Sequence, residues 1–197
     1  MSEWWTYRLS DFLMFSPRTY WRLVELYNND VWPAQLLAAG AGLSILLLAT
    51  VARPGARRIV AASLGVAWLW VGWAFHWQRY TTINWAAAYL AAAFVLQAIF
   101  LIALGLSRGS GQVRPNAGVR HLGRALAVCG VLLYPLIPLA TGRSWAQAEV
   151  FGLMPEPTAV ATIGFLLAGG HPHSRWLCIV PALSLVIGFA TLWLLSR

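Results

Sequence analysis

A histidine and an arginine stand between two long apolar stretches of this chain. Residues 75–85, which we call the junction segment, read FHWQRYTTINW. On a helix, His76, Arg79 and Tyr80 follow i, i+3, i+4 spacing and share one face. An arginine can hold an anion, and a histidine can hold a proton or a metal ion. The segment therefore predicts a ligand or ion site; the alternative is an aromatic belt at a membrane surface with a snorkelling arginine.

Two glutamates mark a second candidate segment. Glu149 and Glu156 are the only acidic residues in the second half of the chain. Glu156 comes just before the apolar stretch 159–170, at the expected N-terminus of a helix, where its charge suits the helix dipole. Thr158 and Thr162 add hydroxyl groups one turn apart. Broken helices at membrane depth line cavities, which predicts a site here; the alternative is an interfacial turn with a capping glutamate.

Further polar and aromatic side chains complete the predicted site. Gln97 lies near the middle of an apolar stretch, so we expect its amide to hydrogen-bond another helix or to contact a substrate. Thr82 or Asn84 is expected to cap the helix after the junction. Arg79 and Glu156 are expected to act as charge partners or ligand contacts, with tryptophans as walls. The candidate ligand-binding residues are His76, Trp77, Arg79, Tyr80, Asn84, Trp85, Gln97, Trp145, Glu149 and Glu156.

The usual motifs of metal and catalytic centres do not occur in this sequence. His171 and His173 flank a proline, and no further histidine or acid lies close to them in the chain. Cys129 and Cys178 lie inside apolar stretches and form no Cys-x-x-Cys motif. There is no phosphate-binding loop and no pattern of a catalytic triad. We therefore expect no metal, no cofactor and no catalytic residues, and a binding or transport role rather than an enzyme.

The composition points to a lipid environment for the elements that position these residues. The chain has 197 residues, of which 59% are hydrophobic and 10% are charged, whereas soluble domains are about 25% charged. The formal net charge is +8, and all 14 basic residues are arginines. Because the arginines fall in the short gaps between apolar stretches, they indicate control of membrane topology rather than binding of nucleic acid. The expected partner is the lipid bilayer.

The apolar stretches predict an all-α bundle with about six membrane crossings. Five stretches reach the length of about 20 residues that a crossing needs: 33–52, 59–80, 85–106, 122–141 and 176–195. The stretch 159–170 alone covers only about 18 Å. We therefore join it to the preceding residues and predict one crossing over 146–170, broken at Pro155–Pro157. A re-entrant loop is the alternative.

The first 32 residues form a separate N-terminal segment before the transmembrane domain of residues 33–197. Ser10 and Ser16 are both plausible helix starts. From 17 to 28, aromatic residues mix with charged ones, and Arg22 and Glu25 are spaced to pair on one helix face. The pattern predicts an amphipathic helix, either lying at the membrane interface with its aromatic side toward lipid or packed on the end of the bundle.

Arginine distribution predicts the orientation. Arginines are concentrated in the gaps after the first, third and fifth crossings, which places these gaps in the cytoplasm. With six crossings, both termini lie outside the cytoplasm, and the first crossing inserts uncleaved. The N-terminal segment, the junction segment and residues 142–157 then share the outer face of a bacterial inner membrane.

Three strings resemble one known family. They are Trp4–Phe12, Phe75–Trp77 continued by Asn84–Ala86, and Val150–Thr158. Together they resemble a family of bacterial multi-pass membrane proteins of unknown function, and the resemblance covers nearly the whole chain. It implies that these strings belong together. It lends no catalytic residues, because the family has no assigned activity.

These observations lead to one expected function and two alternatives. We expect a small inner-membrane protein that binds or passes a small solute or ion through an outer-face pocket. The first alternative is an accessory or anchoring subunit of a larger membrane complex. The expected protein partner is either a further copy of the chain, in a homo-oligomer, or a partner membrane subunit. The second is a membrane enzyme acting on a lipid or quinone.

Overall fold

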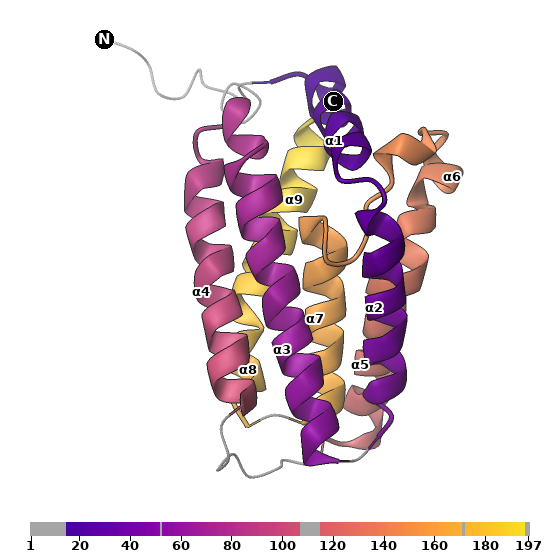
Figure 1. Ribbon diagram of the computed structural model, residues 1–197, viewed down its shortest axis with the longest axis vertical. Coiled ribbons are helices and arrows are strands. Elements are labelled where there is room, and N and C mark those ends of the chain that lie inside the picture. The colour runs from indigo at the N-terminus through magenta and orange to yellow at the C-terminus, as the bar shows by residue number, and fades with distance from the viewer. Residues whose placement is uncertain (1–14, 52, 107–114, 171, 196–197) are drawn as a thin grey trace.

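Helices are the only regular secondary structure in the part of the chain that the computed structural model describes, residues 15–51, 53–106, 115–170 and 172–195. Long helices stand side by side and run alternately up and down (Figure 1). Four helical stretches are long and apolar enough to cross a membrane: Pro54–Thr82, Ala87–Gly105, Ala117–Thr141 and Ser174–Leu195. The bent pair Pro17–Asp30 and Ala34–Leu48 makes a fifth candidate.

Helix α1 (Pro17–Asp30) lies across one end of the bundle, which we call the α1 end. Ser16 caps it through a hydrogen bond from Thr19 N (3.2 Å), so the predicted start at Ser16 is confirmed. The other predicted start, Ser10, falls outside the described residues. The chain then bends by 86° into α2 (Ala34–Leu48).

The aromatic face of α1 packs on protein. Tyr20, Leu23, Val24 and Tyr27 are buried, and the Arg22–Glu25 ion pair (2.9 Å) lies on the exposed side, as its spacing predicts. The buried side chains of α1 therefore contact the end of the bundle, as in the second of the two alternatives for this segment. Its position relative to a membrane stays a prediction.

The next two helices form an antiparallel pair through the junction segment. Helix α3 (Pro54–Trp70) continues as the π-helix η3 (Val71–Trp77), and a short 3₁₀ turn η4 (Tyr80–Thr82) leads toward α4 (Ala87–Leu106). Gly72 lets the helices approach, because a Cβ there would lie 3.0 Å from the Phe94 side chain. The π-helix, a rare form found often at functional sites, carries His76.

The second half of the bundle contains more irregular helices. Helix α5 (Ala117–Val128) passes through the π-helix η5 (Cys129–Leu133) and the 3₁₀ turn η6 (Tyr134–Leu136) into α6 (Ile137–Thr141). Pro135 and Pro138 lack the N–H groups that a regular helix needs, which explains the change of hydrogen-bond pattern. After the 3₁₀ turn η7 (Trp145–Gln147) come α7 (Pro155–Gly169), α8 (Ser174–Leu177) and α9 (Ile179–Leu195).

The start of α7 corrects the sequence prediction. Pro155 and Pro157 lie in the first turn of a continuous helix, and the break precedes them, over residues 148–154. The predicted break at Pro155–Pro157 is therefore wrong. In the first helical turn the N–H groups have no intrahelical partner, so a proline there loses no hydrogen bond. The 15 residues of α7 rise by roughly 22 Å, which is short for a crossing.

The non-helical stretch 148–154 is buried, and neighbouring side chains bind its backbone. The Asn28 amide donates to the carbonyls of Ala146 (2.8 Å) and Ala148 (2.9 Å). The Tyr27 hydroxyl donates to Leu153 O (3.1 Å), and Gly152 N donates to the Thr158 hydroxyl (2.8 Å). These bonds replace the helical ladder where the chain runs through the protein interior.

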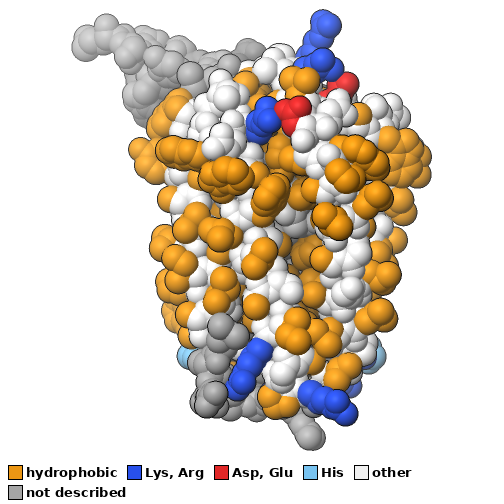
Figure 2. All heavy atoms as spheres, in the orientation of Figure 1, with side chains coloured by type: hydrophobic (Ala, Val, Ile, Leu, Met, Phe, Trp, Pro, Cys, Tyr) orange, Lys and Arg blue, Asp and Glu red, His pale blue; other side chains and the backbone are white. Residues whose placement is uncertain are grey.

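Helix α7 occupies the centre of the bundle, between α3, α5 and α9 (Figure 1). Where α7 contacts η5, a Cβ on Gly130 would lie 2.5 Å from Ala161 N, so the two backbones nearly touch. On the α3 side, Trp68 Nε1 donates to the Thr162 hydroxyl (2.8 Å). On the face shown in Figure 2, charged side chains gather at the two ends, and hydrophobic side chains dominate between them.

Candidate functional site

A small cavity of about 20 Å³ lies inside the bundle near the α1 end. It is large enough for one water molecule, which needs about 10–15 Å³. Its polar lining comes from five elements: Tyr20 on α1, His76 on η3, Tyr80 on η4, Glu156 on α7, and Ser184 with Thr191 on α9. We call it the central cavity.

Glu156 reaches this cavity from the first turn of α7. Glu156 is 4% exposed, and its Oε2 has no hydrogen-bond partner among the described residues. Helix α9 leaves room for the carboxyl group at Gly188, where any Cβ would collide with Oε1. The helix dipole of α7 favours negative charge at this position, as the sequence predicted.

His76 faces the same cavity. It is 3% exposed, and neither Nδ1 nor Nε2 has a partner among the described residues. Its ring packs edge-on against Phe94, with centroids 4.5 Å apart, and lies 6.0 Å from the Tyr80 ring. A buried imidazole and a buried carboxyl group with free polar atoms therefore line one water-sized space.

Aromatic rings close this space on its α1 side. The Tyr20 ring, which lines the cavity, lies 6.1 Å from the Tyr80 ring, and Tyr80 stacks on Phe75 at 5.8 Å. The Tyr27 ring packs against Phe75 at 5.5 Å, and its hydroxyl accepts a hydrogen bond from Trp70 Nε1 (3.1 Å). Helix α1 thus forms a lid over the central cavity.

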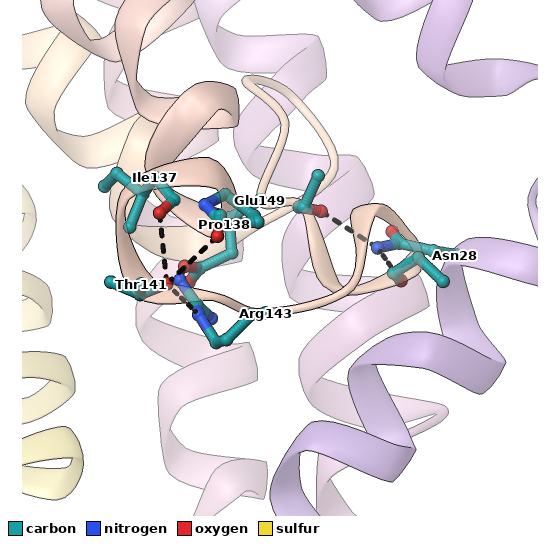
Figure 3. Close-up of polar contacts among 8 residues, drawn as sticks. Asn28, Ile137, Pro138, Thr141, Arg143 and Glu149 are labelled. Atoms are coloured by element: carbon teal, nitrogen blue, oxygen red, sulfur yellow. Dashed lines mark hydrogen bonds and ion pairs between the residues drawn. The ribbon is translucent and has the colours of Figure 1, made fainter.

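A second, partly open cavity of about 320 Å³ lies between α1, α6 and α9. Arg143 and Glu149 meet at one side of it, with Arg143 Nη2 3.5 Å from Glu149 Oε2. Figure 3 shows Arg143 held between Thr141 and Glu149. Its Nε donates to the Thr141 hydroxyl (3.0 Å), and its guanidinium lies 3.8 Å from the centre of the Trp21 ring. We call this space the Arg143 cavity.

A groove of about 890 Å³ runs over the α1 end. It is lined by α1 side chains, by Arg79 and neighbours from the junction segment, and by Gln147. The Arg79 guanidinium pairs with Asp30 (2.6 Å), not with Glu156 as expected, because Asp30 ends the helix that lies over the junction. The described residues contain no group of three or more His, Cys, Asp or Glu side chains able to hold a metal ion.

Residues 18–196 match the model of DUF6064, a family of unknown function. The chain belongs to this family. The resemblance to a family without an assigned activity is thereby confirmed. No curated protein and no solved structure matches the chain. The function of this DUF6064 chain is therefore argued from its geometry.

The remaining predicted residues of the DUF6064 chain take structural positions. Gln97 donates to Leu177 O (2.8 Å), which confirms the predicted bond to another helix. Asn84 accepts from Ala86 N (3.0 Å) and caps the turn before α4. The tryptophans expected as walls are all more than half exposed, as in the belt alternative; they are Trp77, Trp85 and Trp145.

Sequence reasoning grouped the ten candidates into one pocket, and the structure divides them. His76, Tyr80 and Glu156 share the central cavity, whereas Glu149 lies in the Arg143 cavity and Arg79 in the surface groove.

Several lining residues were missed, among them Tyr20, Arg143 and Gly188. One pattern could have revealed the α9 side: Ser184, Gly188 and Thr191 follow i, i+4, i+7 spacing and place small or hydroxyl side chains on one face of an apolar helix.

Proposed function

We propose that this DUF6064 chain is a multi-pass inner-membrane protein that binds or passes a small ion or solute, with His76 and Glu156 as a proton-binding centre. The observation that carries the proposal is the central cavity, where both side chains are buried with unpartnered polar atoms. Ionisable groups kept inside a membrane bundle are costly and commonly mark ion or proton pathways. A purely structural pair would be expected to satisfy its hydrogen bonds.

The chemistry of the centre is a reversible proton transfer. A proton leaving the Glu156 carboxyl group would pass through one water in the cavity to an imidazole nitrogen of His76. The products are a carboxylate and an imidazolium, which attract each other across the water. Tyr20 and Tyr80 are the other titratable side chains that line the cavity, and both hydroxyl groups can donate to the carboxylate.

The membrane topology belongs to the same proposal. Four or five candidate crossings come from helix length and composition. We propose that residues 146–170 form one more, with a buried non-helical half and α7 as the helical half. Non-helical backbone at membrane depth is tolerated where protein covers it, and side chains from α1 and α7 bind this backbone. Six crossings would leave the α1 end and the C-terminus outside the cytoplasm.

Proton flux in proteoliposomes tests the function. The purified protein is reconstituted with a trapped pH-sensitive dye, and a potassium diffusion potential drives protons inward. The unmodified protein is expected to acidify the lumen faster than empty liposomes, and Glu156→Gln and His76→Gln to abolish this difference. Glu25→Gln, which changes a partly exposed carboxylate at the same end, is the matched control and should retain the flux.

Two outcomes would contradict the proposal, one for the proton centre and one for the transport role. Unchanged flux in both Glu156→Gln and His76→Gln, with correctly folded protein, would contradict it. A chain that moves no protons at all in any condition, with or without candidate solutes, would contradict the transport role.

An accessory-subunit role is the second candidate, and α9 is the feature that favours it. In the candidate span Ser174–Leu195, most of which is α9, only 11% of the most apolar part is buried, against 33–50% in the other three candidate spans. Lipid alone can cover such a face, but a partner helix can as well. Purification in mild detergent separates the cases: a stoichiometric partner supports the subunit role, and a single-component particle argues against it. The enzyme alternative stays an untested proposal.

A further inference from the structure

The ion pair at the Arg143 cavity makes only some of the hydrogen bonds that its two side chains could form. Arg143 Nη1 and Glu149 Oε1 are both buried without a partner among the described residues. Glu149 is 2% exposed, and the single contact between the two side chains, at 3.5 Å, lies at the long limit of a hydrogen bond. An unpartnered positive donor and an unpartnered negative acceptor therefore belong to one ion pair that lines the cavity.

The position of the arginine is held from three sides. Trp21 lies under the guanidinium plane, Thr141 accepts from Nε, and Glu149 contacts Nη2. Such a fixed guanidinium is suited to bind an oxyanion through its remaining N–H groups. Glu149 Oε1 can accept from an ammonium group of the same ligand.

Apart from Tyr134, the rest of the cavity lining is apolar. Side chains of α9 and α6 line it, among them Phe189, Leu192 and Ile137. A volume of about 320 Å³ falls at the lower end of the range for small-ligand sites, about 300–1,000 Å³. The cavity therefore offers one charged side with both signs and a larger apolar side.

We propose that this cavity binds a zwitterion that carries an ammonium group and an oxyanion next to an apolar body. The oxyanion would bind Arg143 and the ammonium group Glu149, while the apolar body packs against α9. An apolar amino acid and the phosphoethanolamine end of a membrane lipid share this chemistry. The proposal is independent of the proton centre, because the two sites use different charged residues.

Matched ligand pairs test the proposal without changing the protein. The protein is placed in phosphatidylglycerol nanodiscs, and phosphatidylethanolamine is introduced by lipid exchange. Native mass spectrometry then counts the bound phosphatidylethanolamine and the bound phosphatidylglycerol, which lacks the amine. In a separate arm, radiolabelled leucine competes with unlabelled leucine or with isocaproate, which lacks the amine. The expected result is at least about tenfold preference for the amine-bearing member in one arm. That arm identifies the source of the ligand.

Variants assign the effect to the two residues. Glu149→Gln is expected to remove the preference for the amine, and Arg143→Gln to lower binding of both members of the pair by about tenfold. Arg22→Gln, at an exposed arginine outside the cavity lining, is the matched control and should bind like the unmodified protein. No preference in either arm, or a preference that survives Glu149→Gln in folded protein, would overturn the proposal.

Discussion

Gly188 sets how close α9 comes to the Glu156 carboxyl group. Gly188→Ala is expected to lower the free energy of unfolding by about 1–3 kcal/mol, because the added methyl group overpacks a filled site. Thermal unfolding in detergent measures the effect, with Gly40→Ala as control, since a Cβ at Gly40 meets nothing within 4 Å.

The same substitution also tests whether the carboxyl group is the obstacle. In a Glu156→Ala background the cost of Gly188→Ala should largely disappear, because the colliding atoms are gone. An equal cost in both backgrounds would show that Gly188 is constrained by something else.

For single residues, spacing along the chain predicted some neighbours correctly, whereas the expected ion pair between helices was wrong. The spacing of His76 and Tyr80 correctly placed them together, but Arg79, expected on the same face, lines the surface groove, because the helix ends at Trp77. Burial of Gln97 correctly required a partner. The expected pairing of Arg79 with Glu156 failed, since sequence does not tell which of two acids on the same end lies nearer. Arg143 was missed because its partner Glu149 comes six residues later on an irregular loop.

The contact of α7 with the continuous helix formed by α5 and η5 depends on glycine. A Cβ at Gly130 would lie 2.5 Å from Ala161 N and 2.7 Å from Pro157 O, both backbone atoms that have little room to move. Gly130→Ala is therefore expected to destabilise the protein by about 1–3 kcal/mol. Gly118→Ala on the same helix, whose nearest contact is 3.6 Å, should be neutral or stabilising. Equal melting temperatures for the two variants would contradict the close packing.

The sequence predicted helix boundaries correctly where they depend on residues close together in the chain. Ser16 before Pro17 correctly predicted the start of α1, and apolar length correctly located the long helices. The Pro155–Pro157 pair was misread because prolines break helices in their interior but suit their first turn. The buried stretch before α7 depends on hydrogen bonds from α1, a long-range contact that no local pattern reveals.

For the whole molecule, the proposal requires that residues 146–170 cross the membrane rather than return to the same side. Single cysteines at exposed positions test this: Ser144→Cys at the α1 end and Gly169→Cys at the other end, with Cys129 and Cys178 replaced. A membrane-impermeant maleimide is expected to label Ser144→Cys in intact cells and Gly169→Cys only after lysis. Labelling of both from outside would indicate a re-entrant segment instead.

The low share of charged residues and the lengths of the apolar stretches predicted a helical bundle, and the described part of the chain has four helical stretches long and apolar enough to cross a membrane. The arrangement around α7 was not predictable in the same way. It depends on which helix carries glycine opposite which neighbour, as Gly188 does opposite Glu156.

The central claim is that His76 and Glu156 face one shared water-sized cavity, and ¹⁵N NMR of the histidine side chains tests it most directly. The chain has 4 histidines, and the His76 resonances are those lost in His76→Gln. We predict that they shift in Glu156→Gln and stay in place in the Glu25→Gln control. His76 resonances that are identical in the unmodified protein and in folded Glu156→Gln would contradict the account.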